Sequence, residues 1–565
     1  MILTVISWLW IGVASLLCGF AGLKLLFFRK KEVTWGIDLC FISGLCVLTV
    51  YAQTFSLFYK IGAVATGLLL CICVGIGVVF FRDLKRYMGK LFKSWKPFLV
   101  IISAIIGLIC LQLTVQYAIH YDTDLYHAQS IRWIEEYGVV KGLGNLHNRF
   151  AYNSAFFCLQ ALFSLKFAVN RSLHTMNGFI TAFMLIWAVA SMNIFHRKKI
   201  VTSDLFKAGV VFYIVYTEAR YVVSSSGSDI LALTLVLYLS AKWCELLEEN
   251  SKQESGYWLL CLLSVWAATV KLSAGMLVFL AVYPAVQLIK TKRWKTIAWL
   301  IGCGLVILLP FLIRNVLILG YLLYPYASID LFSVDWKMAE SVVREDSREI
   351  RAWGRTMTQR EQYDAPFSVW FPAWYNSLIT FYRVMFWCSV LGLVGSIFYT
   401  FWCIRKSHQW YRLNLLLINA AGLILWFCGA PLIRYGVIYL LLLPIMFTGF
   451  LLEKINLQAF SVPGVVILLS YSFITIGQFA LWYGRPPVKI PFDYSEREVT
   501  VSEVDGIQIY VASKTDQVGY HYFPGVPNQG RLDVIELRTD KLEDGFRLKE
   551  EYRDQNIIPD GRVVE

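Results

Sequence analysis

The segment 120–127, His-Tyr-Asp-Thr-Asp-Leu-Tyr-His, holds the side chains of this chain that are best suited to acid–base chemistry. Two carboxylates, two histidines and two tyrosines follow the apolar run 97–117, which is long enough to cross a membrane. Polar groups at the end of such a span are costly unless they serve a function. A carboxylate near the apolar boundary has its pKa raised by desolvation, which strengthens it as a base, so the segment suits proton abstraction from a substrate.

The composition indicates a membrane protein. Of 565 residues, 57% are hydrophobic and only 16% are charged, whereas soluble domains average about 25% charged residues. The first apolar run, 2–28, has no basic region before it and no small-residue cleavage site after it, so we expect a span rather than a removable signal peptide. The formal net charge of +13 lies in short loops, which favours membrane orientation over nucleic-acid binding.

Basic residues are concentrated in short connectors between the apolar runs. These connectors are 29–31, 82–96, 196–199, 290–295 and 405–406. Because loops of this kind face the cytoplasm, the pattern predicts an all-α polytopic membrane protein with about fourteen transmembrane helices. The predicted spans are 2–28, 34–52, 61–81, 97–117, 172–195, 205–221, 229–247, 257–272, 274–290, 297–318, 380–403, 411–429, 436–452 and 459–482.

Three long segments fall on the opposite, outer side: 118–171, 319–379 and 483–565. The acidic segment therefore faces outward. In the tail, strand-like runs alternate with turn signals, which predicts a small α+β exterior domain. We divide the chain into N-terminal extra transmembrane helices (1–96), a membrane core with the two outer loops (97–482) and the exterior C-terminal domain.

The outer loops carry their own helical patterns. Residues 125–137 fit an amphipathic helix, and 150–167 fit a helix that lies in the membrane interface. The charge run 344–351 is typical of a solvated helix face. The aromatic residues nearby fit either a membrane-interface belt or a surface that stacks on sugar rings: Trp353, Trp370, Trp374 and Tyr375.

Cysteine usage predicts neither a disulfide framework nor a metal–thiolate site. Most of the 13 cysteines lie inside apolar runs, where they act as small hydrophobic residues. None is paired with a histidine at the spacing of a zinc site. The residues themselves therefore indicate no bound cofactor.

A second polar group lies at the outer ends of the predicted spans. It comprises Arg220, Asp229, Lys271, Arg314, Arg434 and Tyr435. Four cations at one depth suggest a binding site for an anion, such as the phosphate of a lipid. The competing interpretation is ordinary snorkelling of long side chains to the interface. Lys271 argues against it, because it lies between Val270 and Leu272 with almost no polar loop around it.

The motif Asp122-Thr123-Asp124-Leu125-Tyr126 resembles the Asp-Glu-x-x-Tyr motif in the first outer loop of the GT-C superfamily of membrane glycosyltransferases, with the second acid displaced by one position. The segments 121–133, 313–325, 430–436 and 517–527 more closely resemble a group of uncharacterised bacterial polytopic membrane proteins related to that superfamily. The resemblance covers most of the chain from about residue 97, and the three spans before it are extra.

The resemblance implies a glycosyltransferase in the bacterial inner membrane with its active site facing the exterior. Such an enzyme moves a sugar, with inversion, from a polyprenyl-phosphate donor to a cell-surface polysaccharide or glycolipid. By the motif match, Asp122 is the catalytic base and Tyr126 belongs to the substrate site. Asp124 and His127 would orient the acceptor or help to hold a divalent metal ion, which some relatives use. The expected phosphate clamp is Arg314 and Arg434, with Lys271 and Arg220 behind them.

Alternatives from other classes stay open. A transporter or flippase for lipid-linked glycans would place charges near the bilayer midplane and show repeat symmetry. A polysaccharide polymerase or ligase would use the same kind of donor and transfer whole glycan units. A non-enzymatic scaffold is the third alternative. For Asp124 the competing role is that of a helix cap at the start of the following helix.

Overall fold

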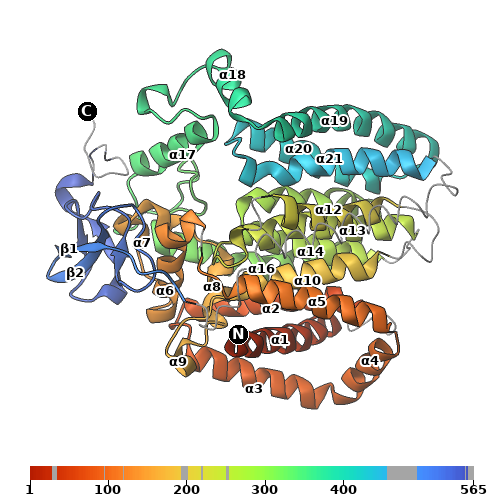
Figure 1. Cartoon of the computed structure of the whole chain (residues 1–565), viewed down its shortest axis with the longest axis horizontal. Coiled ribbons are helices and arrows are strands. Elements are labelled where there is room, and N and C mark those ends of the chain that lie inside the picture. Colours follow the sequence, from red (N-terminus) through yellow and green to blue (C-terminus); the bar gives the residue numbers. More distant parts are fainter. Residues whose placement is uncertain are drawn as a thin grey trace.

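The computed structural model describes residues 1–27, 35–94, 96–118, 120–192, 201–217, 221–249, 254–454, 493–553, 555 and 557. The chain is mostly helical, and its long helices lie side by side in one bundle (Figure 1). They are α1 (Ile2–Leu26), α2 (Ile37–Ser56), α3 (Ala63–Val79), α4 (Phe81–Ser94), α5 (Pro97–Thr114), α10 (Met176–Ser191), α12 (Thr202–Tyr216), α13 (Asp229–Glu248), α14 (Glu254–Val270), α15 (Val282–Lys290), α16 (Trp294–Leu319), α19 (Thr380–Ser407), α20 (Tyr411–Cys428) and α21 (Ile433–Lys454).

The described helices make this a multi-pass membrane protein. Nine of the described helical segments are long and apolar enough to cross a membrane, or ten if the bent pair α3–α4 counts as one span. One of the nine is the 3-10 helix η4 (Leu272–Ala281) continued by α15. The helices α10, α12 and α14 lie on predicted spans but have only 16, 15 and 17 residues. The last predicted span, 459–482, lies outside the described residues. The described part of the chain therefore supports a smaller number of full-length spans than the fourteen expected.

The helices differ in how far they are enclosed by the rest of the bundle. In α13, 78% of the most apolar 18-residue segment is buried inside the protein. In α16, only 11% of the corresponding segment is buried. A helix whose apolar residues face outward is stable only beside a lipid-like environment. The bundle therefore has α13 near its centre and α16 at its periphery.

Small residues allow α1 and α2 to pack in close contact. A Cβ atom on Gly19 would lie 1.8 Å from the carbonyl oxygen of Cys40. A Cβ atom on Gly44 would lie equally close to the carbonyl oxygen of Ser15. Close backbone approach of this kind is typical of membrane helices, whose association depends on packing rather than on the hydrophobic effect.

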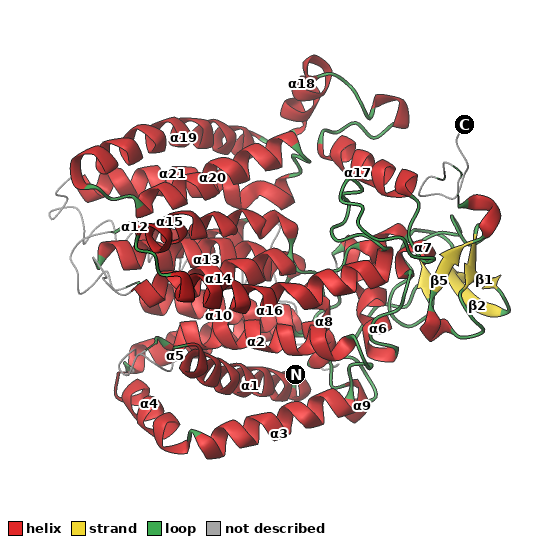
Figure 2. Ribbon diagram, turned by 180° about the vertical axis from the view of Figure 1, so that it is seen from behind, coloured by secondary structure: helices red, strands yellow, loops and turns green. Residues whose placement is uncertain are grey.

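A second layer covers one end of the bundle (Figure 2). It contains the short helices α6 (Ala128–Glu136), α7 (Leu143–Leu146), α8 (Ala155–Leu162) and α9 (Lys166–Val169), and also α17 (Glu340–Gly354) and α18 (Phe367–Ser377). The helix expected to lie in the membrane interface at 150–167 is replaced by short segments. Every residue of α8 is buried, because α8 packs against α2 and α6 inside the protein.

The tail forms the strand-containing part of this second layer. Its strands are β1 (Val499–Val504), β2 (Ile507–Ala512), β3 (Gly525–Val526), β4 (Ile535–Leu537) and β5 (Phe546–Leu548). Strands β1 and β2 are antiparallel, β3 runs parallel to β2, and β4 pairs with β5 in a separate sheet. Asp505 and Gly506 have positive φ angles between β1 and β2, as a tight hairpin turn requires.

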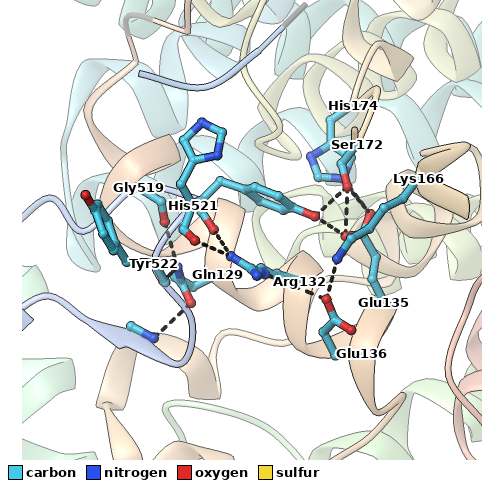
Figure 3. Close-up of polar contacts among 12 residues, drawn as sticks. Gln129, Arg132, Glu135, Glu136, Lys166, Ser172, His174, Gly519, His521 and Tyr522 are labelled. Carbon is cyan, nitrogen blue, oxygen red and sulfur yellow. Dashed lines mark hydrogen bonds and ion pairs between the residues drawn. The ribbon is translucent and has the colours of Figure 1, made fainter. Parts of the chain in front are cut away.

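The tail shares one hydrophobic core with the outer loops. Ile509 and Phe546 of the tail pack in the same buried cluster as Trp133 of the first loop and Val342 of the second. Figure 3 shows the polar part of this contact, where the side chains of α6 meet the backbone of 519–522. The C-terminal domain expected from the sequence is thus an integral part of the second layer.

Candidate active site

The acidic segment folds into a widened helical turn. Residues Thr123–His127 form a π-helical turn that continues into α6, and the amide of Ala128 donates to the carbonyl of Thr123 five residues back. Such turns are rare and are found frequently at functional sites. The turn directs Asp122, Tyr126 and His127 into one cavity, while Asp124 is not part of the cavity wall.

The cavity has a volume of about 1180 Å³ and lies where the bundle meets the second layer. Its wall combines the acidic segment with the ends of α14 and α20, the first turn of α21, the helix α17 and part of the tail. Seven of the residues predicted for the site line it: Asp122, Tyr126, His127, Asp229, Lys271, Arg434 and Tyr435. Tertiary folding therefore brings together side chains that are more than 300 residues apart in the sequence.

Asp122 forms an ion pair with Arg434. Oδ2 of Asp122 lies 2.8 Å from Nη2 of Arg434, and both side chains are mostly buried. Burial raises the pKa of Asp122, but the positive charge of Arg434 outweighs it, so the pKa lies below its usual value. The rise in pKa expected from the sequence does not occur, because the cation lies against the carboxylate. Asp122 is therefore ionised at neutral pH.

A second ion pair lies beside the first. Lys271 contacts Oδ1 of Asp229, and its ammonium group lies 4.8 Å from the centre of the Tyr435 ring. Arg434 donates a hydrogen bond of 2.9 Å to the hydroxyl group of the same tyrosine. Tyr435 thus joins the two pairs, and the cluster carries two positive and two negative charges. An incoming anion or a proton transfer would shift this balance.

Two neutral histidines complete the cluster. Burial lowers the pKa of His127 to about 3, and it also lowers the pKa of His120. Their rings are stacked with centres 6.1 Å apart. Among the described residues, neither Nδ1 atom has a hydrogen-bond partner, although both are buried. Both atoms are closed off from solvent, and of the two rings only that of His127 lines the cavity.

Three predicted site residues are placed elsewhere or not described. Asp124 accepts two hydrogen bonds from Arg497 of the tail, 3.0 Å from Nε and 2.5 Å from Nη2. Burial raises the pKa of Asp124, and Arg497 offsets this only in part. Arg314 is buried and donates to Oγ of Ser56 at 2.5 Å, behind the cavity wall. Arg220 lies outside the described residues.

The acidic segment does not assemble the donors of a metal site. Among the described residues, no three side chains of histidine, cysteine, aspartate or glutamate gather closely enough to hold an ion. Asp122 and Asp124 diverge around the π turn, and each is already paired with an arginine. The residues present do not fit the divalent ion that the resemblance implies.

The structure also adds residues that the sequence analysis missed. Arg149 and Asp516 line the cavity, and Asp346 lies directly behind it. Trp353, which the sequence analysis assigned to either an interface belt or a sugar-stacking surface, also lines the cavity. Asp346 belongs to the charge run expected to be a solvated helix face, yet its side chain is fully buried. The only sequence signal was the density of polar residues in 145–153, which an outer loop does not otherwise need.

Comparison with known proteins gives one match. The model of a family described as "Domain of unknown function (DUF8201)" matches residues 1–441. No curated protein matches the chain. No solved structure matches it either. The matched range includes the acidic segment and Arg434, and it ends before the tail.

Proposed function

The chain belongs to this family of unknown function, and for it we propose a membrane glycosyltransferase of the GT-C type that uses a polyprenyl-phosphate-linked sugar. The observation that carries the proposal is the cavity at the end of the bundle, where Asp122 lies among Arg434, Lys271 and two neutral histidines. A carboxylate and cations in one cavity are the groups that sugar transfer from a lipid phosphate requires.

The reaction assigns a role to each group. The acceptor hydroxyl attacks the anomeric carbon of the donor sugar and gives its proton to the carboxylate of Asp122. The bond between the anomeric carbon and the phosphate oxygen breaks, and the phosphate leaves with the electron pair. Arg434 and Lys271 would stabilise the charge that develops on the leaving phosphate. His127 would contact the sugar from the cavity wall.

Part of the cavity wall is apolar. Leu425, Trp426 and Leu432 belong to its wall at the junction of α20 and α21. Leu425 is 53% exposed. We expect the polyprenyl chain to lie along this apolar part of the wall while its phosphate enters the cavity. We place the cavity on the outer face of the bacterial inner membrane, following the basic cytoplasmic connectors.

The test is sugar transfer by the purified protein in nanodiscs, with a panel of polyprenyl-phosphate-linked sugars. We expect turnover by the wild type and a loss of about 10²–10⁴-fold in Asp122→Asn, the usual contribution of a general base. Arg344→Gln is the matched control, because Arg344 is 73% exposed and lies on the surface of α17. Donor binding without turnover would instead favour a flippase or a scaffold. Transfer of preassembled glycans alone would favour a polymerase or ligase.

A further inference from the structure

Arg149 is a buried cation whose hydrogen-bonding capacity is unused. Its side chain is 14% exposed and lines the cavity. Its closest carboxylate oxygen is Oδ1 of Asp346 at 3.6 Å, which is too long for a hydrogen bond. Among the described residues, the guanidinium group donates no hydrogen bond. A guanidinium group offers five N–H donors in a planar arrangement that matches the oxygens of a phosphate or carboxylate.

Aromatic rings hold this guanidinium group in place. Its central carbon lies 5.4 Å from the ring centre of Trp353 and 5.9 Å from that of Tyr152. Stacking of this kind fixes the plane of the group without using its N–H donors. The group is therefore oriented before a ligand arrives, which lowers the entropic cost of binding.

The carboxylate behind Arg149 is occupied by other donors. Asp346 accepts hydrogen bonds from Asn148 at 2.5 Å, from the hydroxyl group of Tyr152 at 2.5 Å and from that of Tyr324 at 2.8 Å. These bonds satisfy the buried carboxylate, and its charge still balances the nearby arginine. The negative charge of Asp346 thus keeps Arg149 charged and in position. Because Asp346 accepts its hydrogen bonds from other residues, the N–H groups of Arg149 remain available to a ligand.

Tyr126 lies between the surroundings of Arg149 and the Asp122 cluster. Its ring centre is 6.3 Å from that of Tyr152 and 4.3 Å from that of His127. Arg351 of α17 lines the same outer part of the cavity and is exposed. Among the described residues it has no ion-pair partner. In contrast, Arg434 and Lys271 are already paired with carboxylates.

We propose that Arg149, supported by Arg351 and stacked between Trp353 and Tyr152, binds an oxyanion carried by the acceptor, so that the acceptor is an acidic glycan. The oxyanion is a phosphate or carboxylate group that enters from the outer face. This inference rests on the proposed function only in assigning the oxyanion to an acceptor. The anion site itself follows from the unused donors in the cavity.

The experiment measures binding to the full-length protein in nanodiscs without any donor. The probes are inorganic phosphate, glucuronate and, as the uncharged control, glucose. At least one of the two anions should bind the wild type, and glucose should not. In Arg149→Gln we expect the dissociation constant of that anion to rise by about tenfold or more, the effect of losing charge-assisted hydrogen bonds. Arg344→Gln should bind like the wild type.

A second variant covers the case in which Arg149→Gln does not fold. Arg351→Gln changes an exposed side chain and should weaken the same anion by a smaller factor. The proposal is overturned if neither anion binds the wild type, or if both variants bind as tightly as the wild type. It is also overturned if Arg149→Gln weakens only a polyprenyl phosphate placed in the nanodisc, because the oxyanion would then belong to the donor.

Parallel transfer assays separate the two proposals. If the wild type transfers sugar but binds neither anion, the acidic-acceptor inference fails and the glycosyltransferase proposal stands. If anions bind at Arg149 and no lipid-linked sugar is turned over, the glycosyltransferase proposal fails and the anion site stands.

Discussion

The Asp122 cluster in the cavity and the Glu135 cluster at the tail interface are both buried groups of ionisable side chains, but they differ in how completely the protein satisfies them. Oε1 of Glu135 lies 2.9 Å from Nε2 of His174, and Oε2 accepts from the hydroxyl group of Tyr520 at 2.5 Å. Ser172 donates to the same carboxylate, and Nδ1 of His174 contacts the hydroxyl group of Tyr494. Figure 3 shows Glu135, Ser172 and His174 of this cluster, beside the backbone of 519–522.

The cavity cluster leaves polar atoms without protein partners. Among the described residues, the Nδ1 atoms of His120 and His127 and the guanidinium group of Arg149 have no hydrogen bond. A closed network stabilises a contact, whereas an open one keeps donors and acceptors available to a ligand. We therefore interpret the Glu135 cluster as structural and the Asp122 cluster as ligand-binding.

Glu135→Ala should have the largest effect on stability. Removing one partner of a buried, hydrogen-bonded pair typically costs about 3–5 kcal/mol. The tail should lose its contact with α6 and become sensitive to protease, which thermal unfolding and limited proteolysis would detect. Glu136→Ala is the matched control, since Glu136 is 32% exposed and pairs at the surface with Lys166. Equal losses in both variants would contradict the structural role of the Glu135 cluster.

Arg434→Gln should act on the chemistry of the cavity. It removes the cation that lowers the pKa of Asp122, so burial then raises that pKa. We expect transfer to fall by about 10²-fold, comparable to the loss of one preorganised electrostatic contact. The acid limb of the pH–rate profile should move to higher pH. A profile that keeps its acid limb in place would show that Asp122 is not the titrating base.

Neutral, buried His127 should make the free energy of unfolding depend on pH below 6.5. Its pKa is lowered from 6.5 to about 3 in the folded protein, so between these values the unfolded chain binds a proton that the folded chain does not. Stability is therefore lost as the pH falls below 6.5, by up to about 1.4 kcal/mol per pH unit for this group. The lowered pKa values of His120 and His147 contribute in the same direction.

Glu135 acts in a different window. Its pKa lies below the ordinary 4.5, so the stability it contributes is present above 4.5 and is lost at lower pH. His127→Gln should flatten the unfolding curve between pH 6.5 and 4.5 and leave the steeper loss below 4.5. Unfolding midpoints measured across this range in wild type and variant test the separation. If the unfolding midpoint of His127→Gln depends on pH above 4.5 as steeply as that of the wild type, His127 does not cause this dependence.

Asp124→Asn should have the smallest effect. It breaks the ion pair with Arg497 but keeps a side chain that can still accept a hydrogen bond. We expect a loss of stability of about 1 kcal/mol and a change in transfer of only a few-fold, measured with the same assays. A loss of transfer as large as that of Asp122→Asn would mean that both acids take part in the chemistry.

The sequence by itself determined the membrane class, the long apolar helices and the clustering of polar groups at segment 120–127. These features depend on composition and on local periodicity, which neighbouring residues fix. It also identified seven of the polar side chains that line the cavity, because charged residues at the ends of apolar helices are expensive to retain. The GT-C resemblance and the roles assigned from it remain predictions.

Only the tertiary structure decided which of the two acids faces the cavity. Asp122 pairs with Arg434 and Asp124 with Arg497, each partner more than 300 residues away in sequence. The π turn separates the directions of these two side chains, and no local pattern predicts where distant arginines will lie. Arg149 became a candidate for the same reason. A cation is available to a ligand only when folding gives its carboxylate other donors, and that depends on contacts between elements.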